Sequence, residues 1–131
     1  MKDRVLIDTS VWIDYFQDTN SAGSELMDGI LSHGDVYVPK VVIAELIQGA
    51  RSEKEIGVIK EFVEAFTIVE EGKETWHKAG KLSYDLKKKG ETINLTDCYI
   101  AVIAREHNCS ILTLDKHFKK IQKNDGLRLI L

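Results

Sequence analysis

The chain has 131 residues, of which 44% are hydrophobic and 30% are charged. We expect one domain over residues 1–131, because this length suits a single core and leaves little for a second. The longest apolar run, residues 99–104, is far too short to span a membrane, and the formal net charge of −3 is not typical of a nucleic-acid binder.

Short apolar runs alternate with longer runs of helical periodicity along the chain. In chain order the expected elements are a strand at 4–7, a helix at 24–31, a strand at 36–38, helices at 41–50 and 53–65, a strand at 67–69, helices at 73–89 and 96–107, a strand at 110–114, a short helix at 116–121 and a strand at 127–130. This alternation predicts an α/β fold, with a central parallel sheet of about four to five strands and helices on both faces.

Local signals support three helix boundaries. Thr96 can cap the helix at 96–107, and Pro39 precedes a helix that begins near Lys40. Gly90 can end the preceding helix, since glycine readily adopts the left-handed conformation that closes a helix.

No feature indicates export. The first residues lack the long apolar stretch of a secretory signal, so we expect a cytoplasmic protein that does not enter a membrane. Cys98 and Cys109 do not form a disulfide framework, and small, half-buried thiols suit a reducing compartment.

Two aspartates follow predicted strands. Asp8 comes directly after the strand at 4–7, and Asp115 comes directly after the strand at 110–114. In open α/β sheets ligands bind beyond the carboxyl ends of the strands, so we expect these two acids to converge there. Either acid alone is also explained as a turn or helix-capping residue.

Two further acids lie beside apolar segments. Glu45 has apolar neighbours on both sides, and Asp97 opens an almost wholly apolar helix. A buried carboxylate is costly unless it is paired or binds a metal, although Glu45 has a possible partner in Arg51 and Asp97 is also explained as a first-turn acid.

A cluster of carboxylates suits Mg²⁺ or Mn²⁺ and not zinc. One or two such ions can activate water and neutralise charge on a phosphate, so no protein nucleophile is required, and bound cations would also offset the negative net charge. No Ser/His/Asp or Cys/His arrangement competes with the acids. His117 lies near them, but we interpret it as a surface helix residue. Trp12, Tyr15 and Phe16 have helical spacing, which favours core or dimer packing over base stacking.

Four segments together resemble the motifs of the PIN-domain family, and in particular the VapC toxins. They are residues 5–12, 41–49, 95–104 and 111–118, in family order and covering most of the chain. The resemblance implies an α/β/α sandwich and a Mg²⁺- or Mn²⁺-dependent endoribonuclease. It also implies a VapB-like antitoxin whose C-terminal part covers the site, and a homodimer.

By motif, the family's catalytic and metal-binding acids fall on Asp8, Glu45, Asp97 and Asp115. Its small hydroxyl residues near the metal fall on Thr9 or Ser10, and on Thr113. One departure is notable: many relatives carry a further acid two residues after the fourth, and here that residue is His117. A second ion would therefore have fewer anionic ligands.

Basic residues form two dense segments that are candidates for contact with the RNA backbone, although such runs are often only solvated faces. They are Lys87, Lys88 and Lys89, and then Lys116, Lys119, Lys120 and Lys123.

Other classes fit less well. A haloacid-dehalogenase-type phosphatase needs a second acid where Ser10 stands, and a response-regulator receiver needs an aspartate after the third strand, where residues 70–72 are Glu-Glu-Gly. The remaining alternative is a non-catalytic PIN-fold module that binds RNA or protein. An intact set of four acids argues against a pure binder.

Overall fold

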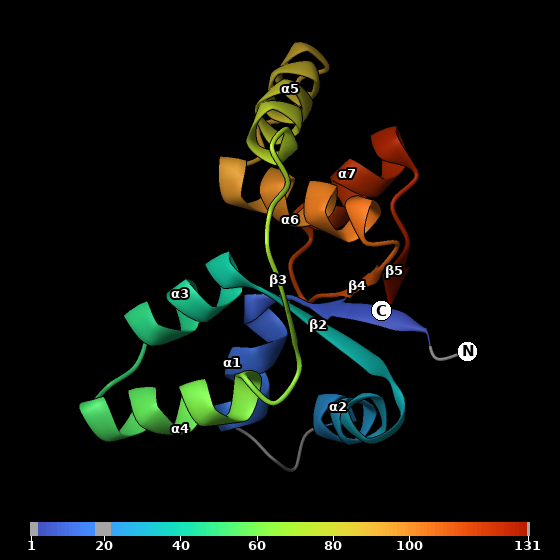
Figure 1. Ribbon diagram of the computed structural model, residues 1–131. Coiled ribbons are helices and arrows are strands. Elements are labelled where there is room, and N and C mark those ends of the chain that lie inside the picture. Colours follow the sequence, from blue (N-terminus) through green and yellow to red (C-terminus); the bar gives the residue numbers. More distant parts are fainter. Residues whose placement is uncertain (1–2, 18–21, 131) are drawn as a thin grey trace.

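The centre of the computed structural model, which describes residues 3–17 and 22–130, is a five-stranded sheet in the order β3-β2-β1-β4-β5 (Figure 1). All four strand pairs are parallel. The strands are β1 (Arg4–Ile7), β2 (Asp35–Pro39), β3 (Thr67–Val69), β4 (Ser110–Leu112) and β5 (Leu129–Ile130). The prediction of an α/β fold with a parallel sheet is confirmed.

Helices cover both faces of this sheet. They are α1 (Thr9–Gln17), α2 (Ala22–His33), α3 (Lys40–Gln48), α4 (Glu53–Val63), α5 (Thr75–Lys88), α6 (Leu95–Glu106) and α7 (His117–Asp125). In Figure 1 α1, α2 and α4 lie below the sheet, while α5, α6 and α7 lie above it. None of the helices in the described segments is long and apolar enough to cross a membrane.

The core explains why two segments are so apolar. Leu6 and Ile7 of β1 have no exposed surface, as expected for a central strand covered on both faces. In α6 every residue from Asp97 to Ala104 is buried, because this helix packs against α5, α7 and β4. Trp12 is fully buried and stacks on Phe16 with a ring-centroid distance of 5.8 Å, so it is a core residue and not a base-stacking surface.

Two predicted helix ends are confirmed. Pro39 occupies the N-cap position of α3, and Gly90 follows the end of α5 with a φ of +85°. The backbone N–H of Gly90 donates to the carbonyl of Lys87, and that of Glu91 donates to the carbonyl of Leu86. This pair of bonds satisfies two carbonyls at the helix end, and glycine makes the positive φ inexpensive.

Two other boundary predictions are wrong. The cap of α6 is Asn94 and not Thr96, because the Asn94 side chain accepts the backbone N–H of Asp97 at 2.8 Å and the helix starts one residue before Thr96. Strand β4 ends at Leu112 and not at residue 114, because the Thr113 hydroxyl accepts the N–H of Asp115 and turns the chain.

Candidate active site

Asp8 lies at the carboxyl end of β1, in the middle of the sheet. Its backbone N–H donates to the carbonyl of Leu112, which extends the pairing of β1 with β4 by one residue. Only 5% of Asp8 is exposed, and its Oδ2 accepts hydrogen bonds from Thr113 Oγ1 at 2.9 Å and Ser10 Oγ at 3.0 Å. Burial raises the pKa of Asp8 above its usual range, while these two hydroxyls partly oppose the rise.

Asp97, Asp115 and His117 meet beside Asp8. One donor atom from each of the three lies within 4.8 Å of the others. His117 Nδ1 is 3.3 Å from Asp97 Oδ2 and 3.2 Å from Asp115 Oδ1. Asp115 also accepts the backbone N–H of His117 at 2.9 Å, so its expected role in starting the last helix and its place in the cluster are compatible.

The surroundings of Asp97 destabilise the ionised form of its carboxyl group. Burial, then the charge of Asp115, and to a smaller extent that of Asp8, raise the pKa of Asp97 from 3.8 to about 6, against the opposing effect of His117. Within residues 3–17 and 22–130, no lysine or arginine forms an ion pair with any of these three aspartates. Negative charge is therefore concentrated here, and among the described residues His117 is the side chain that opposes it.

Glu45 approaches the site from α3 and is connected to it through Thr9. The Thr9 hydroxyl donates to Glu45 Oε1 at 2.8 Å, and Thr9 directly follows Asp8 in the chain. Glu45 is only partly buried, and it does not belong to the cluster formed by Asp97, Asp115 and His117. In the described part of the chain Arg51 is not paired with it, so the alternative explanation of Glu45 as half of that ion pair is not supported.

His117 is a helix residue with 45% of its side chain exposed, as expected, but its ring also contacts both Asp97 and Asp115. These two contacts were not predicted from the sequence, although the position of His117 two residues after Asp115, at the start of a helix, placed it near the site.

The donor set fits a hard divalent cation. Carboxylate oxygens dominate, two of the aspartates are buried, and their mutual repulsion favours any bound positive charge. Thiols, which would indicate zinc, do not contribute: Cys98 and Cys109 are buried, and burial raises the pKa of both to about 11.

Comparison with known proteins agrees with this geometry. The family model for the PIN domain matches residues 5–124. The chain belongs to the PIN-domain family. The match includes all four acids singled out above. This PIN domain is also 33% identical over 129 residues to Ribonuclease VapC1 of Methanocaldococcus jannaschii, which covers 98% of this chain and 88% of the relative.

Two solved structures share the fold of this PIN domain. A chain of the Rickettsia felis VapBC2 complex, bound to a DNA fragment from its promoter, superposes with a TM-score of 0.79 at 17% identity and covers 97% of both chains. A chain of VapBC-1 from nontypeable Haemophilus influenzae gives a TM-score of 0.79 at 23% identity, covering 97% of this chain and 96% of the other. These likenesses establish the PIN-type α/β/α arrangement.

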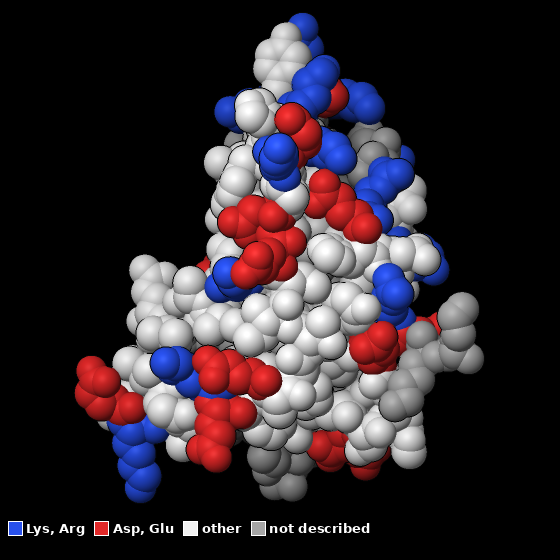
Figure 2. All heavy atoms as spheres, viewed as in Figure 1, with Lys and Arg blue, Asp and Glu red and all other residues white. Residues whose placement is uncertain are grey.

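The two basic segments lie differently relative to the acids. Lys116 and Lys119 line a shallow pocket of about 170 Å³ together with Thr113 and Asp115. Lys87 and Lys88, from the other basic segment, lie in the last turn of α5 and do not line this pocket. In Figure 2 blue side chains gather over α5 and α7 in the upper part of the molecule. The structure thus brings the α7 lysines next to the candidate site.

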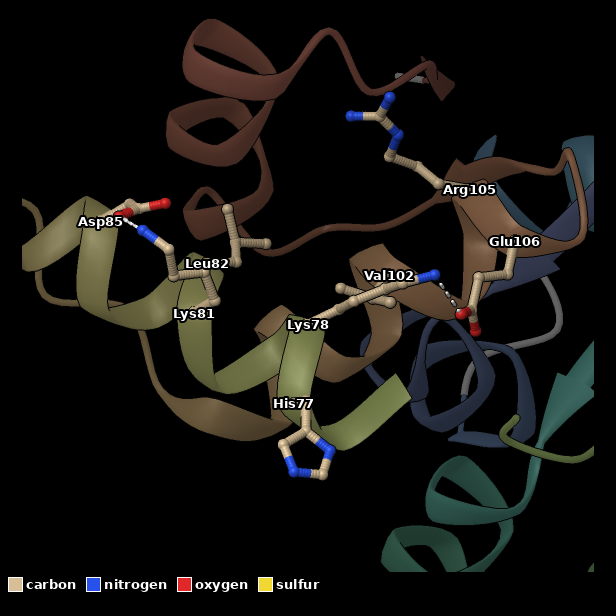
Figure 3. Close-up of a pocket in the computed structure, with 8 residues that line it drawn as sticks. All are labelled: His77, Lys78, Lys81, Leu82, Asp85, Val102, Arg105 and Glu106. Carbon is tan, nitrogen blue, oxygen red and sulfur yellow. Dashed lines mark hydrogen bonds and ion pairs between the residues drawn. The ribbon is translucent and has the colours of Figure 1, made fainter. Parts of the chain in front are cut away.

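A larger pocket, of about 680 Å³, lies between α5 and α6 (Figure 3). Four of its charged side chains form two ion pairs, Lys78 with Glu106 at 3.2 Å and Lys81 with Asp85 at 2.7 Å, and His77 and Arg105 also line it. None of the four candidate acids lines this pocket, so it is separate from the candidate site.

Proposed function

We propose that this protein is a Mg²⁺- or Mn²⁺-dependent endoribonuclease and the toxin component of a toxin–antitoxin pair. The observation that carries the proposal is the convergence of Asp8, Asp97 and Asp115, whose charges repel one another beyond the carboxyl ends of the central strands, with no lysine or arginine of the described residues paired to them. The ribonuclease name of the M. jannaschii relative supports the substrate class.

In this proposal Asp8, Asp97 and Asp115 hold one or two divalent cations, and Glu45 supplies a further carboxylate from α3. A bound cation would supply the positive charge that stabilises an in-line displacement at a phosphate. Ser10 and Thr113 orient Asp8 by donating to its Oδ2, and Thr9 orients Glu45. The protein's contribution is therefore to hold four carboxylates in fixed positions before substrate binds.

RNA reaches these acids only if its own negative charge is accommodated nearby. We propose that Lys116 and Lys119, which line the pocket that contains Asp115, contact the phosphate backbone. Lys87, Lys88 and Lys89 remain candidates for a more distant contact along the same strand of RNA.

An antitoxin of the VapB kind is the partner we propose. The two chains of known structure compared above come from VapBC complexes. A pocket of about 500 Å³ offers both apolar surface, from Phe16, Val58 and Ile59, and charged groups, from Arg51 and Glu55, and it includes Gly49, about one helical turn beyond Glu45. An arginine carried by the partner could then pair with the acids and displace the cation. Inhibition by a partner that binds only away from these acids would contradict this model.

The proposal also includes a single domain over residues 1–131, a homodimer and a cytoplasmic location. Exposed apolar side chains such as Trp76 and Tyr84, 45% and 52% exposed, are available for subunit contact. Sedimentation of the purified protein at several concentrations tests the dimer.

Cleavage of RNA by purified protein, with and without Mg²⁺ or Mn²⁺, tests the function. Asp8→Asn and Asp97→Asn should each abolish cleavage and leave the fold intact, because each removes charge and keeps shape. Asp85→Asn is the matched control, since the side chain of Asp85 is 46% exposed and forms an ion pair with Lys81, away from the four acids. Cleavage at the wild-type rate by either site variant, or cleavage in EDTA, would refute the proposal.

The alternative is a non-catalytic module that binds RNA or protein. It predicts that RNA binding does not require the ion and that no RNA is cleaved under any metal condition. The concentration of unbalanced carboxylates disfavours it, because these charges would repel RNA in a protein that held no cation.

A further inference from the structure

We propose that His117 is a direct ligand of the cation held by Asp97 and Asp115, and that this imidazole makes the site prefer Mn²⁺ to Mg²⁺. The inference rests on the proposed metal-dependent function and adds to it which ion the site selects. It concerns the imidazole that shares a cluster with the carboxylates of Asp97 and Asp115.

The positions of the three donor atoms match those of neighbouring ligands on one ion. In an octahedral complex with bonds of about 2.1 Å, adjacent donor atoms lie about 3.0 Å apart. Nδ1 of His117 lies 3.3 Å from Asp97 Oδ2 and 3.2 Å from Asp115 Oδ1, and the three donor atoms all lie within 4.8 Å of one another. Small side-chain adjustments would allow one ion to contact all three.

In the absence of an ion, a hydrogen bond between His117 Nδ1 and Asp97 Oδ2 at 3.3 Å accounts for only one of the two contacts. A charge-assisted N–H···O bond is about 2.7 to 2.9 Å long, and both contacts of Nδ1 are longer than that. One ring nitrogen carries at most one hydrogen, so it cannot donate well to both Asp97 and Asp115. With its proton on the other ring nitrogen, Nδ1 would direct a lone pair between the two carboxylates, which is the arrangement that a ligand requires.

The ring is held in place by the surrounding structure. His117 is the first residue of α7, and its backbone N–H donates to Asp115 Oδ1 at 2.9 Å. The next residue, Phe118, is fully buried and anchors the start of the helix. On the other side, the Asn94 side-chain amide donates to Asp97 Oδ2 at 3.1 Å. Because both acids and the helix carrying the imidazole are held, the donor set is preorganised.

The choice of ion follows from ligand chemistry. Mg²⁺ binds oxygen ligands almost exclusively and gives up its water reluctantly, whereas Mn²⁺, as a transition-metal ion, accepts imidazole more readily. A site of two carboxylates and one imidazole therefore discriminates against Mg²⁺ more strongly than a site of three carboxylates.

Two measurements on the full-length protein test the inference. The first is pulsed electron paramagnetic resonance of bound Mn²⁺, which detects a directly bonded nitrogen. Wild type should show a nitrogen coupling, His117→Asn should lose it, and His77→Asn should keep it. His77 is the matched control because it is also a histidine next to an acid, 3.5 Å from Glu74, but with 82% of its side chain exposed.

The second measurement is calorimetric titration with Mn²⁺ and Mg²⁺ separately. His117→Asp should reduce the ratio of Mn²⁺ to Mg²⁺ affinity by at least about tenfold, the size of effect that loss of even an outer partner of a metal ligand produces. Circular dichroism establishes that the variants are folded. His117→Asp also keeps a potential ligand at this position, so a change in its ratio reports selectivity and not loss of the site.

The outcomes separate this inference from the function on which it rests. Mn²⁺ bound without nitrogen coupling, in a protein that still cleaves RNA, would overturn the ligand role of His117 and leave the proposed nuclease standing. An unchanged affinity ratio in His117→Asp would overturn the selectivity. Failure of wild type to bind either ion, together with no cleavage, would overturn both.

Discussion

Replacing Asp97 with asparagine should stabilise the ion-free protein while it destroys the proposed site. Asp97 is 7% exposed, and burial together with the charges of Asp115 and Asp8 raises its pKa from 3.8 to about 6. A shift of about two units corresponds to about 3 kcal/mol of unfavourable free energy for the ionised form at neutral pH. Asparagine keeps the shape and does not ionise, so we expect a gain of about 1 to 3 kcal/mol.

The sign of the pH dependence follows from the direction of the shift. The folded state holds the Asp97 proton more tightly than the unfolded state, so this carboxyl contributes most stability below pH 3.8. That contribution is lost as the pH rises from about 4 to about 6. The advantage of Asp97→Asn over wild type should therefore grow across this window and level off above it.

Urea denaturation in EDTA between pH 4 and pH 8 measures the effect. At pH 7.5 the gain should appear as a higher midpoint and, in thermal melts, as a rise of about 3 to 5 °C in Tm for each kcal/mol in a domain of this size. Saturating Mn²⁺ should reverse the order, because wild type binds the ion and the variant does not. Asp85→Asn, at an exposed acid, should show neither effect. Equal stability of Asp97→Asn and wild type in EDTA at pH 7.5, or a difference that does not change with pH, would refute the reasoning.

Two further predictions concern the neighbours of the acids. Thr113→Val removes a buried hydroxyl that donates to Asp8 and accepts from the N–H of Asp115, so we expect a loss of about 1 to 3 kcal/mol in unfolding free energy and weaker Mn²⁺ binding in titrations. Thr113→Ser should retain most of the unfolding free energy and most of the Mn²⁺ affinity, because it keeps the hydroxyl. If Thr113→Val is as stable as wild type, the hydrogen bonds of Thr113 with Asp8 and Asp115 contribute little to stability. Replacing Lys116 and Lys119 together with alanine should weaken binding of single-stranded RNA and reduce the slope of log K against log salt by about 1.4. An unchanged slope would mean that RNA does not contact Lys116 and Lys119. Replacing Lys87 and Lys88 with alanine in the same way tests whether α5 contributes to RNA binding.

Local sequence patterns determined the kind of fold and most of its elements. Apolar runs of strand length alternate with helical periodicity, and this alternation favours a parallel sheet because only crossover helices can connect parallel strands. The same patterns placed Asp8 after β1, and burial on both sides of a central strand explains why that strand is wholly apolar. Pro39 and Gly90 marked helix ends because their backbone restrictions are intrinsic to the residue type.

What the sequence could not decide depends on competition between local signals or on contacts between distant residues. Both Asn94 and Thr96 are good helix caps, and only the path of the chain into α6 selects Asn94. The end of β4 was predicted too late, because the apolar Leu114 continues the strand pattern, whereas the Thr113 hydroxyl forms hydrogen bonds that turn the chain.

The site itself was decided by tertiary structure. Thr113 donates to Asp8 across 105 positions of the sequence, and Thr9 donates to Glu45 across 36. The contact of His117 with Asp97 exists only because α6 and α7 pack on the same face of the sheet and bring their first turns together. Sequence determined which residues have the chemistry for the site, because side-chain type and local periodicity are properties of short segments. Only the fold decided which of their atoms meet, because those distances are set by the packing of strands and helices that are far apart in the chain.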